Sequence, residues 1–169
     1  MKKRKETDVF VGRIFRVTVE QMTSTFRYER VYQRNGVGIF PIPKEGYIRL
    51  IRTSDPDGRN RRIAPMSGII EDADPSPLSC AKREMKEELG LAGTHWKLLA
   101  TVKGGGGFIK NQHFFTVRGL TKAGEGGWDP NERIHGFLDL SFEEVRKLVF
   151  KDKFPADISF ALLKLILKS

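Results

Sequence analysis

The most constraining feature of the sequence is the segment REMKEELGL, residues 83–91, near the middle of the chain. If this segment is helical, Glu84, Glu87 and Glu88 share one face, because residues three and four apart are neighbours on a helix. Two such charges about 4 Å apart repel by about 4 kcal/mol at an effective dielectric of about 20. The helix therefore either extends its acids into solvent or uses them to hold a hard divalent cation, Mg²⁺ or alternatively Mn²⁺.

The flanking residues predict where this helix begins and ends. Ser76 is a suitable N-cap, and Pro77 suits the first helical position, where a missing N–H costs nothing. Gly90 stands where a glycine commonly ends a helix. Apolar residues recur at helical spacing and would fix the direction of the acidic face: Leu78, Ala81, Met85 and Leu89. We therefore predict a helix over residues 76–89.

The spacing around this helix resembles the signature of the Nudix hydrolases, G-x5-E-x7-R-E-U-x-E-E-x-G-U, in which U is apolar. REMKEELGL fits the second half at every specified position. The first half, counted from Gly68, differs: its acid is Asp74, and eight residues instead of seven separate Asp74 from Arg83. An extra residue in the loop before Ser76 would absorb the difference without changing the helix. This difference from the signature leaves the role of Asp74 open.

Periodicity and turn residues predict the remaining elements. The expected strands cover residues 8–20, 23–32, 37–41, 47–52, 96–102, 112–118 and 133–140, and the expected C-terminal helices cover residues 141–150 and 156–168. The turn at residues 43–46 predicts a hairpin between the third and fourth strands. Together with the resemblance, this order implies an α/β (α+β) fold, the Nudix α/β/α sandwich around a mixed sheet. We expect an N-terminal antiparallel ribbon, residues 1–34, followed by the Nudix domain, residues 35–169.

One branch of the family, the ADP-ribose pyrophosphatase-like proteins, is similar to this chain over nearly its whole length. The similar segments are residues 35–42, 50–52, 104–108, 118–120 and 129–132, together with the closing helix. The resemblance implies hydrolysis of the diphosphate bridge of a nucleoside diphosphate linked to another moiety. ADP-ribose, cleaved to AMP and ribose 5-phosphate, is the expected substrate. The resemblance also implies a homodimer formed by exchange of the ribbon.

The resemblance also implies roles for individual residues. Glu84 and Glu88 are the expected metal ligands, and Glu87 completes the site by binding the metal directly or through water. Ser67 is expected to offer its backbone carbonyl to the same metal, and Arg83 is expected to orient the carboxylates. Glu87 and Arg83 are therefore among the expected catalytic residues.

Residues beyond the helix complete the expected site. The branch uses a further glutamate from the loop before the last strand; Glu132 matches that position best, and Glu125 is the second choice. Arg52 and Trp128 are expected to contact the substrate. After Arg52 the chain departs from the branch, which continues with a glutamine, an aromatic residue and a second arginine, whereas this chain has Thr-Ser-Asp.

The composition of the chain indicates which binding partners and which cellular compartment to expect. The net charge is +9, but the basic residues are scattered, so we expect the field to attract anionic nucleotides and do not expect a long nucleic acid as partner. The single cysteine, Cys80, excludes an internal disulfide and suits a reducing compartment. No apolar run reaches the length of a membrane span. We therefore expect a cytoplasmic protein without a membrane partner.

Two alternatives keep the fold and change the function. The same reactive bridge occurs in GDP-sugars, NADH, dinucleoside polyphosphates and capped RNA ends, so the enzyme could act on one of these. A Nudix module that senses a nucleotide without cleaving it is the other alternative. The presence of Glu84, Glu87 and Glu88 favours an enzyme.

Overall fold

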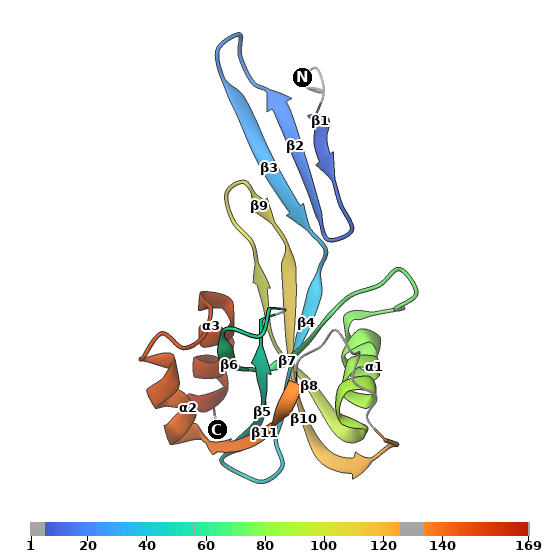
Figure 1. Ribbon diagram of the computed structural model, residues 1–169, viewed down its shortest axis with the longest axis vertical. Coiled ribbons are helices and arrows are strands. Elements are labelled where there is room, and N and C mark those ends of the chain that lie inside the picture. The colour runs from blue at the N-terminus through green and yellow to red at the C-terminus, as the bar shows by residue number, and fades with distance from the viewer. Residues whose placement is uncertain (1–5, 56, 126–133, 169) are drawn as a thin grey trace.

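The computed structural model describes residues 6–55, 57–125 and 134–168. The N-terminal residues form a sheet that extends away from the rest of the chain (Figure 1). Three antiparallel strands make up most of it, and a short strand from later in the chain pairs in parallel with the third. In order across the sheet, the strands are β1 (Glu6–Val11), β2 (Phe15–Gln21), β3 (Arg27–Gln33) and β9 (Phe108–Ile109). The predicted ribbon is therefore present, and we call these four strands the ribbon.

The single strand predicted over residues 8–20 is wrong, because the chain reverses within it. The N–H of Gly12 donates to the carbonyl of Phe15 at 2.8 Å and closes the turn between β1 and β2. A Cβ on Gly12 would press against the exposed ring of Phe10, which would have to move aside. Apolar residues occur on both sides of the turn, which is why periodicity alone did not reveal it.

A mixed sheet lies at the centre of the chain. In order across the sheet, its strands are β7 (Met66–Ile69), β4 (Gly36–Pro41), β10 (Asn111–Lys122) and β8 (Leu91–Lys103). β4 runs parallel to β10 and antiparallel to β7, and β10 runs antiparallel to β8. All residues of β4 are buried, as expected for a strand covered on both faces.

A third, antiparallel sheet contains the strand that follows β4 in sequence. Its strands are, in order, β11 (Ile134–Ser141), β5 (Tyr47–Ser54) and β6 (Arg61–Ala64). The hairpin predicted between residues 37–41 and 47–52 is therefore wrong, since β4 and β5 belong to different sheets. β4 pairs with β7 and β10, whereas β5 pairs with β6 and β11, and a turn signal between two neighbouring strands carries no information about such partners.

The described residues form three helices, α1 (Pro77–Leu89), α2 (Phe142–Val149) and α3 (Ala156–Ile166). Figure 1 shows α1 on one side of the strands and α2 and α3 on the other. Successive side chains of β4 point to opposite faces of the sheet. Ile39 packs in a core cluster with Met85 of α1, and Phe40 packs in a second cluster with Leu162 of α3. The mixed fold expected from the sequence is confirmed. The boundary between a ribbon and a domain at residues 34 and 35 stays a prediction.

Within the described residues, no helix has both the length and the apolar character needed to cross a membrane.

Candidate active site

Helix α1 begins and ends as the sequence predicts. The hydroxyl of Ser76 accepts a hydrogen bond from the N–H of Ser79 at 3.1 Å, and Pro77 is the first helical residue. Gly90 has a left-handed backbone with φ of 61°, and its N–H donates to the carbonyl of Lys86 at 2.9 Å. Cys80 and Met85 are fully buried against the sheet. Because one face of α1 is fixed by this packing, the direction of its acidic face is fixed as well.

The acidic face of α1 is only partly open to solvent. Glu84 is 9% exposed and Glu88 is 4% exposed, whereas the side chain of Glu87 is 55% exposed. Gly68 of β7 lies directly against Glu84, and a Cβ at this glycine would overlap the Glu84 carboxyl group. The glycine therefore provides the space in which this buried acid lies.

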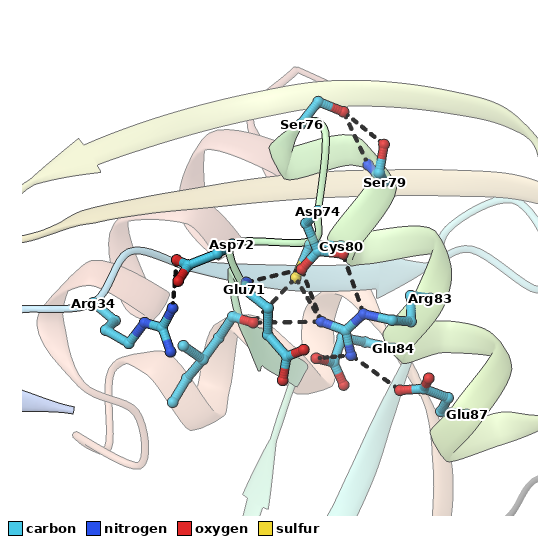
Figure 2. A network of polar contacts seen from close by, with 11 residues as sticks. Arg34, Glu71, Asp72, Asp74, Ser76, Ser79, Cys80, Arg83, Glu84 and Glu87 are labelled. Carbon is cyan, nitrogen blue, oxygen red and sulfur yellow. Dashed lines mark hydrogen bonds and ion pairs between the residues drawn. The ribbon is translucent and has the colours of Figure 1, made fainter. Parts of the chain in front are cut away.

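Arg83 links the acids of this region (Figure 2). Its Nη1 atom lies 2.9 Å from Oε1 of Glu84 and 3.0 Å from Oε2 of Glu87. On the other side of the guanidinium, Nη2 lies 2.9 Å from Oδ2 of Asp74, and Nε donates to Oδ1 at 3.2 Å. The bonds to Asp74, followed by the charge of Glu84 and the bond to Glu87, raise the pKa of Arg83. One cation thus neutralises part of a site that contains several carboxylates.

Asp74 acquires a clear structural role from this arrangement. Besides both bonds from Arg83, its carboxylate accepts a hydrogen bond from the N–H of Glu71 at 2.9 Å. The Arg83 guanidinium is the main cause that lowers the pKa of Asp74 from 3.8 to about 2. The longer loop therefore still brings its acid to Arg83, and Asp74 fixes the orientation of the guanidinium.

Replacing Asp74 by asparagine should destabilise the fold in a pH-dependent way. At pH 7 we expect a loss of about 1.5–3 kcal/mol, the usual contribution of hydrogen bonds to a charged group. Because the folded-state pKa lies below the unfolded value, the carboxylate stabilises the fold above about pH 4. This stabilisation disappears as the pH falls through about 2. Urea unfolding of both proteins between pH 7 and pH 2 measures the difference.

The exposed loop residue Asp57 provides the control for this prediction, because its replacement by asparagine should change stability little at any pH. A difference between wild type and Asp74→Asn that stays constant down to pH 2 would contradict the assigned role of the carboxylate.

The thiol of Cys80 is not a nucleophile. It is fully buried, and its Sγ atom lies 3.5 Å from the carbonyl oxygen of Ile69. Burial, together with the negative charges of Asp74 and Glu84, raises the pKa of Cys80 to about 12. The thiol is therefore neutral at physiological pH and serves for packing.

The acidic face of α1 borders a cavity of about 1190 Å³. The acids that line it are Glu71, Glu84, Glu87, Glu88 and, from α3, Asp157. Besides Arg83, the cations that line it are Arg34 and Lys110 at the junction between the ribbon and the central sheet, and Arg13 in the turn between β1 and β2. This turn contacts the junction through the hydrogen bond from Arg34 to Ile14. One cavity thus combines carboxylates that suit a metal with cations that suit phosphate groups.

A family model described as the NUDIX domain matches residues 32–160 of the sequence. The chain belongs to the Nudix family. A solved structure described as "Crystal structure of ADP compounds hydrolase" superposes with a TM-score of 0.73 at 20% sequence identity, covering 98% of this chain and 94% of that one. No protein with a curated description matches the sequence. The family, the fold and the enzyme class expected from the sequence, a Nudix pyrophosphohydrolase, are confirmed.

The structure brings most of the expected Nudix site residues to one place. Those that line the cavity are Ser67, Arg83, Glu84, Glu87 and Glu88. Arg52 is exposed on β5 and does not line the cavity, and Glu125 is exposed after β10. Trp128 and Glu132 lie outside the described residues. The roles assigned to all these residues stay predictions.

The cations that line the cavity of this Nudix protein were missed in the sequence. Arg13, Arg34 and Lys110 are far apart along the chain, and no local pattern joins them. Gly36 and Gly38 of β4 also line this cavity, and as alternate residues of a strand they share a face. A Cβ on Gly36 would press against the Gln112 side chain, and a Cβ on Gly38 would press against the ring of Phe114.

The residues of the Nudix helix fit a hard divalent cation. Glu84, Glu87 and Glu88 line the same cavity as Ser67, and Mg²⁺ and Mn²⁺ prefer oxygen ligands such as carboxylates and backbone carbonyls. In the described part of the chain no three Asp, Glu, His or Cys side chains converge on one point. Two of the acids, Glu84 and Glu87, instead bond to Nη1 of Arg83. Each of these carboxylates uses one oxygen for Arg83, so its second oxygen can bind a cation while the bond to Arg83 is kept.

Proposed function

We propose that this Nudix protein hydrolyses the diphosphate bridge of a nucleoside diphosphate linked to a second moiety, with ADP-ribose as the first candidate substrate. The observation that carries this proposal is the composition of the cavity, which combines the acids of α1 with three cations from the ribbon and its junction with the central sheet. Its volume of about 1190 Å³ is also large for a ligand pocket, since such pockets usually measure about 300–1,000 Å³. A molecule that extends on both sides of a diphosphate suits such a space.

The side chains around the cavity would have different roles in the reaction. Glu84, Glu87 and Glu88, with the carbonyl of Ser67, would hold Mg²⁺ or Mn²⁺. When bound, such a cation stabilises negative charge on phosphate oxygens and makes a water molecule more acidic. Arg83 orients Glu84 and Glu87 through its two bonds at Nη1. The cations at the ribbon junction raise the local concentration of an anionic substrate.

The proposal also includes residues outside the described lining of the cavity. Glu132, or Glu125 in its place, would supply another carboxylate as metal ligand or base. Arg52 and Trp128 would contact the part of the substrate beyond the phosphates. ADP-ribose, cleaved to AMP and ribose 5-phosphate, is preferred because a solved structure similar to this chain is described as that of an ADP compounds hydrolase.

A homodimer that forms through the ribbon is part of the same proposal. Apolar side chains are exposed on the ribbon at the first turn and on β1: Val9, Phe10, Val11, Ile14 and Phe15. Exposed apolar surface of this kind suits a contact with a second copy of the chain. Light scattering at micromolar protein concentration measures the mass. The cytoplasmic location and the lack of a long nucleic-acid partner remain predictions.

The test of the activity is phosphate release measured with a coupled phosphatase. We expect turnover of ADP-ribose in Mg²⁺ and none in EDTA, with lower activity on GDP-mannose, NADH, a diadenosine polyphosphate, capped RNA and dGTP. A preference for another compound of this series would replace ADP-ribose and keep the reaction. Nucleotide binding without turnover of any compound would instead favour the sensing module.

A further inference from the structure

Arg34 lies where four parts of the chain meet. Its backbone N–H donates to the carbonyl of Ile14 in the first turn of the ribbon at 3.0 Å. The neighbouring Asn35 accepts the N–H of Ile70 on its carbonyl at 2.9 Å and the N–H of Asn111 on its side-chain oxygen at 2.8 Å. The backbone that carries Arg34 is therefore fixed against the ribbon, the loop that follows β7, and β10.

The side chain of Arg34 is less firmly held than its backbone. It lines the cavity, and its Nη2 atom lies 2.8 Å from Oδ1 of Asp72 (Figure 2). Asp72 lies in the turn over residues 71–74, closed by the N–H of Asp74 donating to the carbonyl of Glu71 at 3.0 Å. The Asp72 side chain is fully exposed, and that of Arg34 is 35% exposed. This pair therefore joins a cation of the cavity to a carboxylate in solvent.

An exposed ion pair of this kind contributes little stability, because water screens both charges. A diphosphate carries more charge than a single carboxylate and presents several oxygens, and a guanidinium can bind two of them at once. The phosphate group of a ligand in the cavity is therefore a stronger partner for Arg34 than Asp72 is.

We propose that Arg34 binds a phosphate group of the substrate and that Asp72 occupies Arg34 until the substrate displaces it. The identity of the anion as a diphosphate rests on the proposed function. Arg34 is then a substrate-binding residue, and Asp72 is a positioning residue that holds the guanidinium at the cavity and weakens the binding of the ligand. The two residues have opposite effects on affinity although they form one ion pair.

The test is the equilibrium affinity for ADP-ribose and for inorganic pyrophosphate, measured by calorimetry in EDTA, where no turnover occurs. Arg34→Ala should bind both probes about 10- to 100-fold more weakly, since a hydrogen-bonded charge pair is lost. Arg34→Lys should recover part of this loss. Asp72→Asn should bind both probes about two- to fivefold more tightly, because the competing ion pair is gone.

A double variant separates competition from a general effect of charge. In the Arg34→Ala background, Asp72→Asn should no longer change the affinity, since there is no guanidinium to compete for. Arg49 and Asp139 provide the control, because they form an ion pair outside the cavity lining in which the arginine is about as exposed as Arg34. Arg49→Ala and Asp139→Asn should leave the affinity unchanged. If Asp72→Asn increased the affinity equally with and without Arg34, Asp72 would not compete with the ligand for the Arg34 guanidinium, and the inference would be overturned.

Steady-state kinetics distinguishes failure of this inference from failure of the proposed function. With an active enzyme, Arg34→Ala should raise KM and Asp72→Asn should lower it, with kcat changed much less. Hydrolysis with unchanged affinity in both variants would overturn the inference and keep the function. Opposite changes in affinity without hydrolysis of any compound would keep Arg34 as an anion-binding residue and remove the proposed reaction.

Discussion

Replacing Glu88 by glutamine should reduce kcat on the preferred substrate by about a hundredfold or more. The substitution keeps the shape of the side chain and removes the charge that would hold the cation. Bound metal contributes several kcal/mol of charge stabilisation to reactions of this type, which corresponds to this loss of rate. Glu88 is only 4% exposed, so the neutral side chain removes a buried charge from the fold. We therefore expect Tm to stay within about 4 °C of the wild type.

Metal titration and a matched variant complete this experiment. Glu88→Gln should bind Mn²⁺ more weakly in calorimetry, whereas Glu143→Gln, in an exposed ion pair with Lys147 on α2, should keep normal turnover and metal binding. Normal turnover by Glu88→Gln would remove Glu88 from the metal site.

Replacing Gly68 by alanine should be nearly as damaging, for a steric reason. The new Cβ would overlap the carboxyl group of Glu84, so that the acid or strand β7 must move. Overpacking of this kind costs about 1–3 kcal/mol of stability. Displacing a group of the site by about 1 Å can reduce the rate about a hundredfold. Urea unfolding and the coupled phosphatase assay measure the two effects on the same preparation.

Gly105 provides the control for this steric effect. It lies in the loop between β8 and β9, and a Cβ there would meet no atom within 4 Å. Gly105→Ala should therefore have wild-type stability and turnover. If Gly68→Ala behaved in the same way, the position of Glu84 against β7 would not matter for the reaction.

Local features of the sequence predicted local structure well. Ser76, Pro77 and Gly90 placed both ends of α1, because a helix end is decided by residues within one turn of it. The same holds for α2, which was expected from residue 141 and begins at a capping box formed by Ser141 and Glu144. The acidic face of α1 followed from the helical period, so the carboxylates of the candidate site could be found without a structure.

Features that depend on distant partners could not be predicted in this way. β4 and β5 are neighbours in sequence but pair with β10 and β11, which lie more than 60 residues further along. The short strands β6 and β7 have only four residues each, too few for a clear period. The cations of the cavity come from three separate segments that only the folded chain brings together. Among them, Arg34 was visible only as one of many scattered basic residues.

The contact between Asp74 and Arg83 changes how the family signature should be read. A pattern that requires seven residues between the acid and the arginine passes over this chain, although the two side chains meet at 2.9 Å. The additional residue lies between Asp74 and Arg83, and the shorter acid still reaches the Arg83 guanidinium. What the signature specifies here is a distance between charged groups, and several loop lengths can satisfy it. Searches that allow the loop to vary and keep the helix fixed would recover proteins built like this one.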